Sequence, residues 1–285
     1  MVQCGVSGCL LIVATPIGNL EDITLRALRV LREASLIAAE DTRRTARLLQ
    51  HYSISTPTTS LHEHNERQKL PLILERIERG DRIALVSDAG TPGLSDPGAR
   101  LVAAALDRGL RVEPIPGPSA VLAALSASGF PGDSFTFLGF PPVRGKDRKQ
   151  WFKNVATESR TAVFFEAPHR IKATMTDLAC VLGERPICVC RELTKLHEEK
   201  VKRPTAEALA ALSDLRGEFT IVVGPFRATL KTSSQPPDDA LVTAEFGRIT
   251  ESKGVSRRAA IASVARKLGL SSREAYGAIE RAKAK

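Results

Sequence analysis

The sequence predicts an α/β protein built as two α/β domains followed by a small helical domain. Short apolar runs alternate with amphipathic stretches up to about residue 225, Gly/Pro-rich segments interrupt this alternation near 129–145, and the end of the chain carries helical periodicity alone. The length of 285 residues agrees with about two domains. We expect α/β domains at 1–130 and 131–226, a linker at 227–239 and the helical domain at 240–285.

The first domain alternates strands and helices in a regular order. Apolar runs predict strands at 10–14, 36–39, 58–62, 82–87 and 111–114, and amphipathic spacing predicts helices at 25–32, 42–50, 65–78, 97–108 and 119–128. Connections of this kind are right-handed and place successive strands parallel to one another. A mostly parallel sheet follows.

The second domain resumes the alternation, and the tail departs from it. Strands are predicted at 161–165, 186–191 and 219–223, with helices at 171–182 and 205–215. In the tail, apolar residues repeat at i, i+3, i+4 and i+7 from Ile261 and again from Ala275, on either side of a turn at Gly269. We expect a helix-turn-helix-like unit that packs against a third helix near 241–249.

The charge of the chain is uneven. Lys and Arg number 41 against 32 Asp and Glu, which gives a net charge of +9. The residues from Phe226 onward account for +6 of it, which leaves +3 for the first 225 residues. A basic surface favours a polyanionic partner such as nucleic acid, so the tail is a candidate docking module.

Several classes of protein are excluded. No apolar run approaches 18 residues and the N-terminus lacks a basic segment ahead of its apolar run, so we expect a cytoplasmic protein without a membrane partner. Five cysteines without a CxxC pair indicate reduced thiols, and Cys188 and Cys190 are expected to be buried on one strand face. His62 and His64 lack a third ligand, so we expect no metal site.

Three Gly/Pro-rich loops directly follow predicted strands: TPIGNL at 15–20, SDAGTPGLSDPG at 87–98 and PIPGPSA at 114–120. Ligands of parallel sheets bind beyond the carboxyl ends of the strands, so the three loops predict one shared site for a small ligand. Ordinary turns between strand and helix are the alternative. The nucleotide motifs GxxxxGK[ST] and GxGxxG are absent, and the loops by themselves leave the ligand open.

These loops, together with AAEDTR at 38–43, FFEAPHR at 164–170 and GEFTIVV at 217–223, resemble the tetrapyrrole-methylase superfamily. Within it they are similar to the bacterial branch that methylates the 2′-oxygen of a cytidine ribose in 16S rRNA. The resemblance covers residues 11–225, with the motifs in the family's order. It implies an rRNA ribose 2′-O-methyltransferase with S-adenosylmethionine in the cleft between the two α/β domains, the small ribosomal subunit as partner, and a homodimer.

Two other functions stay open at this point. A methyltransferase acting on a small tetrapyrrole would share the fold, but Asn19 stands where porphyrin-directed members carry an Asp. A DNA-binding regulator that senses a ligand would use the helical tail, but three ligand loops favour an enzyme.

The resemblance also implies which residues contact the cofactor. They lie in the three loops and on the strands of the second domain. They are Pro16, Gly18, Asp88, Gly90, Thr91, Pro92, Gly93, Ser119, Ala120, Phe165, Thr194, Glu218 and Thr220.

A ribose hydroxyl is a weak nucleophile, so a positioned proton acceptor is expected. Glu166 and His169 are the preferred candidates because they follow a predicted strand at the cleft, with Glu40, Asp41 and Glu63 as alternatives.

Basic residues beside the motifs and in the tail are expected to hold RNA phosphates. They are Arg43, Arg144, Lys146, Arg148, Lys149, Arg170, Lys195, Arg257, Arg258 and Arg273. The four at 144–149 precede Trp151 and Phe152, which could stack on exposed bases. The alternatives are structural ion pairs, a helix whose aromatic side chains pack inward, and for the tail a solubilising face or a dimer arm.

Overall fold

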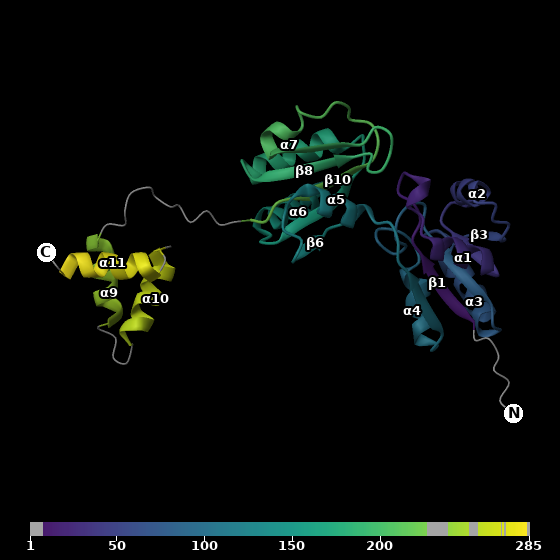
Figure 1. Cartoon of the computed structure of the whole chain (residues 1–285), viewed down its shortest axis with the longest axis horizontal. Helices are drawn as coiled ribbons and strands as arrows, with labels where there is room; N and C mark the ends of the chain where they lie inside the picture. Colours follow the sequence, from purple (N-terminus) through teal and green to yellow (C-terminus); the bar gives the residue numbers. More distant parts are fainter. Residues whose placement is uncertain (1–7, 227–238, 251–255, 269, 271, 284–285) are drawn as a thin grey trace. The chain divides into compact units, whose positions relative to one another are not determined.

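The computed structural model describes residues 8–226, 239–250, 256–268, 270 and 272–283 (Figure 1). The chain divides into two compact units, one up to Phe226 and one from Arg227 onward. The first unit contains two sheets, and the second contains the helices of the tail. No helix in the described part of the chain is long and apolar enough to span a membrane.

The first sheet has five parallel strands in the order β3-β2-β4-β1-β5. The strands are β1 (Cys9–Val13), β2 (Leu36–Ala39), β3 (Thr58–Ser60), β4 (Arg82–Val86) and β5 (Arg111–Ile115). The predicted parallel sheet is confirmed, with β3 shorter than expected.

Helices cover both faces of this sheet because alternate strand residues point to opposite sides. Leu11 and Val13 pack with α1 (Leu25–Glu33) and α2 (Thr42–His51). Leu10 faces the other way, toward α3 (Glu66–Glu78) and α4 (Ala99–Asp107). A short 3-10 helix, η1 (Leu20–Asp22), precedes α1, and the Asn19 side chain caps it by accepting from the Glu21 amide.

The second sheet is mixed, with the order β6-β7-β10-β8-β9. Its strands are β6 (Phe135–Phe137), β7 (Thr161–Glu166), β8 (Pro186–Arg191), β9 (Glu199–Pro204) and β10 (Phe219–Val223). Only the β6–β7 pair is parallel; β7–β10, β10–β8 and β8–β9 are antiparallel. The edge strands β6 and β9 were not predicted.

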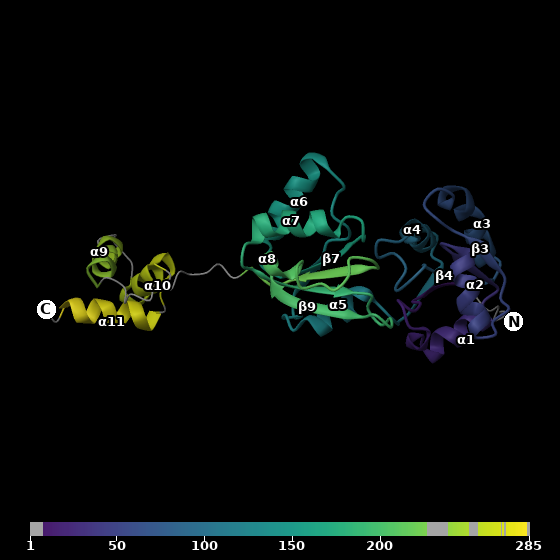
Figure 2. The same ribbon diagram turned by 90° about the horizontal axis from the view of Figure 1, so that it is seen from above.

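Helices α6 (Gly145–Thr157), α7 (Ile171–Leu182) and α8 (Thr205–Ala208) pack on one face of the second sheet, and α5 (Ala120–Ser128) packs on the other (Figure 2). We expected α5 with the first sheet, but its apolar face covers β7 and β10. The helix predicted at 205–215 ends at Ala208. Cys188 and Cys190 are buried on the α5 side, as their alternation predicts.

In the second unit, α9 (Asp239–Thr250), α10 (Arg257–Leu268) and α11 (Ser272–Lys283) enclose a small core. The core contains Val242, Val264 and Ile279, so the expected third helix is confirmed. The predicted turn at Gly269 lies outside the described residues.

Candidate cofactor and substrate site

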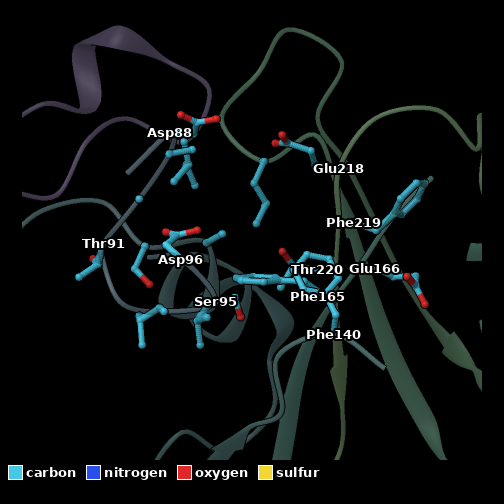
Figure 3. Close-up of a pocket in the computed structure, with 18 of the residues that line it drawn as sticks. Asp88, Thr91, Ser95, Asp96, Phe140, Phe165, Glu166, Glu218, Phe219 and Thr220 are labelled. Carbon is cyan, nitrogen blue, oxygen red and sulfur yellow. The ribbon is translucent and has the colours of Figure 1, made fainter. Parts of the chain in front are cut away.

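A cavity of about 400 Å³ lies in the first unit where the two sheets face each other (Figure 3). From the first sheet, Glu40 follows β2 directly and Asp88 lies two residues after β4. From the second sheet come the end of β7 and the start of β10, which lie side by side because the two strands are antiparallel. The cavity thus occupies the place where parallel sheets bind ligands.

One wall of the cavity is acidic and comes from the first sheet. The Asp88 carboxylate accepts from the Asp41 amide at 3.0 Å and pairs with Arg44 at 3.3 Å. The Glu40 carboxylate accepts from the Asp88 amide at 3.4 Å. Asp96 completes this wall and reaches toward the middle of the cavity (Figure 3).

The pKa values of two of these carboxyl groups reflect their enclosure. Burial raises the pKa of Glu40, and the neighbouring Asp88 charge raises it further. Burial also raises the pKa of Asp96 to about 6, although a hydrogen bond with Ser87 opposes the shift. The pKa of Asp96 therefore lies close to neutral pH, where a carboxylate is an effective general base.

The opposite wall is aromatic and apolar and comes mainly from the second sheet. Phe165 lies at its centre, with ring centroids 5.0 Å from Phe137 and 5.6 Å from Phe140. Leu193 and Thr220 also line this side of the cavity, whereas the Phe219 ring turns away from it and packs in the core between the second sheet and α6 and α7 (Figure 3). Phe140 differs from its neighbours in remaining 48% exposed.

Direct contacts join the three Gly/Pro-rich loops to one another. Thr15 and Gly90 exchange two backbone hydrogen bonds of 2.9 Å, and Gly90 adopts the positive φ of +83° that this turn requires. The Thr91 hydroxyl donates to the Pro118 carbonyl at 3.1 Å. The next residues, Ser119 and Ala120, begin α5 at the edge of the cavity. The loops therefore form one continuous rim.

The model of the family described as Tetrapyrrole (Corrin/Porphyrin) Methylases matches residues 10–210. The chain belongs to this family. Two curated relatives are each called ribosomal RNA small subunit methyltransferase I. The one from Vibrio cholerae is 48% identical over 239 residues, 82% of each chain. The one from Escherichia coli O157:H7 is 46% identical over 241 residues, 83% of each chain.

Solved structures of two methyltransferases share the fold at lower identity. The cobalamin biosynthetic enzyme cobalt precorrin-4 methyltransferase has a TM-score of 0.59 at 18% identity, covering 79% of this chain and 98% of that one. Uroporphyrin-III C-methyltransferase from Thermus thermophilus, complexed with S-adenosylhomocysteine, has a TM-score of 0.56 at 18% identity, covering 76% of this chain and 97% of that one.

The structure brings most of the expected cofactor residues of this tetrapyrrole methylase to the cavity. The residues that line it are Asp88, Gly90, Thr91, Ser119, Ala120, Phe165, Glu218 and Thr220.

Five expected cofactor residues lie elsewhere. Pro16 and Gly18 flank Ile17, which alone of the three lines the cavity. A Cβ on Gly18 would lie 2.8 Å from the Leu193 carbonyl oxygen, so this glycine allows close packing of the loop against the second sheet. The Thr194 hydroxyl accepts from the Asn19 amide at 3.1 Å in the same contact. Pro92 and Gly93 border a separate hollow beside α4 and β5.

Several residues of the cavity were not expected there. They are Ile17, Arg44, Ala89, Leu94, Ser95, Asp96, Val121, Phe140, Ala167, Pro168, Leu193 and Phe219, with Glu40 expected only as an alternative base. Ser95 and Asp96 belong to the loop motif SDAGTPGLSDPG, so its second SD pair was an available signal. Nothing in the sequence around Phe140 distinguishes it from other apolar residues.

The geometry argues against Glu166 as the proton acceptor. Glu166 borders the cavity, but its carboxylate is fully buried and turns away from the cavity (Figure 3). The carboxylate accepts from the Thr174 hydroxyl and from the Ala167 amide at 2.7 Å, and it pairs with Arg170 at 3.1 Å. His169 is exposed and does not line the cavity. Of the alternatives, Asp41 caps α2 and pairs with Arg43, which lowers its pKa to about 2.

Three basic residues expected to hold RNA phosphates are already used within the protein. Arg148 pairs with Asp177 at 2.8 Å, Arg170 pairs with Glu166, and Lys195 lies 2.9 Å from both Glu192 and Glu218. These contacts within the fold argue against a role of the three side chains as phosphate ligands. The structure also argues against stacking by the neighbouring aromatic pair, because Phe152 is buried and Trp151 packs edge-on against it and Phe164.

The remaining basic residues are exposed. Arg144, Lys146 and Lys149 have no ion pair within the described part of the chain, and the same holds for Arg258 and Arg273 of the tail. Arg43 is 89% exposed although it pairs with Asp41. Arg257 pairs with Glu280. Among the described residues, no group of three His, Cys, Asp or Glu side chains is arranged to hold a metal ion.

Proposed function

We propose that this tetrapyrrole methylase is an S-adenosylmethionine-dependent methyltransferase that modifies rRNA of the small ribosomal subunit, on the 2′-oxygen of a cytidine ribose. The observation that carries the cofactor assignment is the cavity with one acidic and one aromatic wall at the ends of parallel strands. The names of the curated relatives support rRNA of the small subunit as the substrate.

The cavity fits this cofactor in size and in chemistry. Its volume of about 400 Å³ lies within the range of small-molecule sites. When bound, S-adenosylmethionine supplies a methyl group on a positively charged sulfonium. Asp88, Glu40 and Asp96 provide negative charge for that cation, and Phe165 provides a flat apolar surface that excludes water. The first amides of α5, at Ser119 and Ala120, offer hydrogen-bond donors to a carboxylate.

We propose that a carboxylate of the acidic wall accepts the proton of the ribose hydroxyl, with Asp96 as the first candidate. Asp96 lines the cavity, and its carboxylate is not held by an arginine within the described residues. Its pKa of about 6 leaves it ionised at neutral pH while keeping it a stronger base than an ordinary aspartate. Glu40, whose pKa is also raised, is the second candidate.

We propose that RNA phosphates contact the exposed cations. On the first unit these are Arg43, Arg144, Lys146 and Lys149, and on the tail they are Arg257, Arg258 and Arg273. The tail at 240–285, joined by a linker at 227–239, then serves as a docking module for the α/β domains. A cytoplasmic location and a homodimer complete the proposal.

Transfer of label tests this function directly. The full chain is incubated with methyl-labelled S-adenosylmethionine and small ribosomal subunits from a strain that lacks the protein, and the digested nucleosides are separated. We expect label on a 2′-O-methylcytidine. Label on a porphyrin offered in parallel, or none on rRNA, would contradict the proposal.

A truncation after Phe226 tests the tail separately. Since the first unit is compact by itself, the truncated chain should bind S-adenosylhomocysteine as the full chain does. Its methylation of subunits should fall at physiological salt. Equal activity of both chains would rule out the docking role of the tail.

A further inference from the structure

The FFEAPHR motif and the basic segment at 144–149 meet in a network of polar side chains that joins α6 to α7. The Thr174 hydroxyl donates to Glu166 and accepts from Arg148 at 3.0 Å. Arg148 is also held by Asp177, at 2.9 Å from its Nε, and its guanidinium lies 4.8 Å from the centre of the Phe152 ring. Arg170 joins the network through its ion pair with Glu166.

Both arginines of this network also donate to consecutive carbonyl groups of one loop. Arg170 donates to the Pro141 carbonyl, and Arg148 donates to the Pro142 carbonyl at 3.0 Å. The prolines restrict the backbone of the loop, and the hydrogen bonds from the two arginines hold its carbonyl groups in place. The network therefore determines where the residue just before Pro141 lies.

That residue is Phe140, the exposed aromatic of the cavity wall. It borders the cavity beside Phe165 while leaving 48% of its surface in solvent (Figure 3). A single exposed apolar side chain is common on protein surfaces, but an exposed ring that lines a cavity together with another exposed apolar side chain favours a binding partner. Leu94, also exposed, lines the same cavity from the first-sheet loops.

The chain beyond Phe140 carries exposed cations. Val143 is 71% exposed, and it is followed by Arg144, Lys146 and Lys149 at the start of α6. An apolar ring followed within ten residues by free cations matches the chemistry of single-stranded RNA, in which bases stack on aromatic side chains and phosphates pair with basic groups.

We propose that Phe140 is the platform on which an unpaired base of the RNA substrate stacks at the mouth of the cavity, and that Glu166, Arg170 and Arg148 are positioning residues that hold this platform. The inference rests on the proposed rRNA methylation. It gives Glu166 a task that does not involve the transferred proton. A base stacked on Phe140 would have its ribose at the mouth of the cofactor cavity.

The test measures methylation of small subunits by Phe140→Ala, Phe140→Trp and, as a matched control, Phe226→Ala, which removes another half-exposed phenyl ring outside the cavity. Phe140→Ala should raise the KM for subunits about tenfold, the usual effect of one lost base–aromatic stack. Phe140→Trp should restore it, and Phe226→Ala should change it less than twofold. Binding of S-adenosylhomocysteine, measured by calorimetry, should stay within twofold in Phe226→Ala, and in Phe140→Ala it should weaken by a much smaller factor than the KM for subunits rises.

Two results would overturn the platform. In one, Phe140→Ala weakens S-adenosylhomocysteine as much as it raises the KM, which assigns the ring to the cofactor. In the other, the KM is unchanged. If the wild-type chain fails to methylate subunits, the proposed function itself fails, and this is seen before any variant is compared.

Two experiments test the positioning network. One uses the single variant Glu166→Gln, and the other is a double-mutant cycle of Arg148→Lys and Phe140→Ala. Glu166→Gln should raise the KM for subunits and leave the pH dependence of kcat as in the wild type. Arg148→Lys should raise the KM in the native background but not in the Phe140→Ala background, because both changes act on one contact. The positioning role would be contradicted if Glu166→Gln abolished the rise of kcat with pH on the acidic side. It would also be contradicted if the effects of Arg148→Lys and Phe140→Ala on the KM were additive.

Discussion

The two walls of the cavity differ in charge and in how the sequence builds them. The acidic wall consists of residues in the loops after β2 and β4, and the aromatic wall is formed by residues on or beside strands of the second sheet. In the parallel first sheet all strands end at the same edge, so several long loops meet there and can support carboxylates with backbone amides. Asp88 is held in this way by the amide of Asp41.

The second sheet is mostly antiparallel, so its loops do not all meet at one edge. It offers strand residues such as Phe165 and Thr220 instead, one directly opposite the other on β7 and β10. The Glu166 carboxylate at the end of β7 is buried in an ion pair with Arg170. The comparison indicates that the first sheet supplies most of the carboxylates at the cavity, whereas the second supplies mainly its apolar surface.

Breaking an internal pair of the second sheet should have the largest effect on stability. Glu166→Ala leaves Arg170 without its buried partner, so we expect the free energy of unfolding to fall by about 3 kcal/mol. Glu218→Ala on the same wall is the matched control, since Glu218 is 67% exposed and its loss should cost less than about 0.5 kcal/mol. Urea unfolding measures both, and equal losses would contradict the distinction.

Removing a charge from the acidic wall should weaken binding of cations. Asp88→Asn should lower the affinity for sinefungin, which carries an amine near the position of the sulfonium, at least tenfold. The affinity for S-adenosylhomocysteine, a neutral thioether, should fall by a smaller factor. Asp41→Asn, next to the cavity but not lining it, serves as the control. Equal losses for both ligands would show that the wall does not recognise charge.

The raised pKa of Asp96 predicts a pH effect of defined sign. Between pH 4 and 6 the folded chain holds the Asp96 proton more tightly than the unfolded chain does, so the contribution of Asp96 to stability falls as the pH rises through this range. The shift to about 6 corresponds to about 3 kcal/mol, which solvent at this partly exposed site reduces to roughly 1 kcal/mol.

Asp96→Asn should therefore be as stable as the wild type at pH 4 and more stable at pH 7. Thermal unfolding across this range measures the difference. Asp41→Asn is the control of opposite sign, because the lowered pKa of Asp41 stabilises the folded chain at neutral pH and this stabilisation is lost as the pH falls toward 2. An Asp96→Asn variant that gains nothing at pH 7 would show that the carboxylate is fully solvated. The same variant should also lose the limb of the methylation profile that rises through pH 6.

The smallest expected effect is on the salt dependence of rRNA binding, which should differ between basic residues without an ion pair and those within one. Replacing Lys146 and Lys149 by Gln should make the slope of log affinity for rRNA against log salt shallower by about 1.5, since each phosphate contact contributes roughly 0.7 to 0.9. Lys195→Gln should leave the slope unchanged, because its ammonium already lies 2.9 Å from two carboxylates. A change of slope for Lys195→Gln alone would reverse the assignment.

The first sheet could be predicted almost entirely from the sequence. Strands such as β1 and β4 are buried apolar runs, each followed by a Gly/Pro-rich loop, and these patterns depend only on residues near in sequence. The edge strand β9 could not be predicted in this way. Its sequence EKVKRP is charged and largely exposed, and pairing with β8 defines it as a strand.

The parallel sheet, the ligand loops, the family and eight of the expected cofactor residues that line the cavity could be predicted from the sequence alone. The tertiary structure decided which charges remain available. Arg148 and Lys149 are neighbours in sequence, yet one is held by Asp177 on another helix and the other faces solvent. Local patterning follows from residues a few positions apart, whereas the partner of a charge or the exposure of a ring such as Phe140 depends on which distant segment folds beside it.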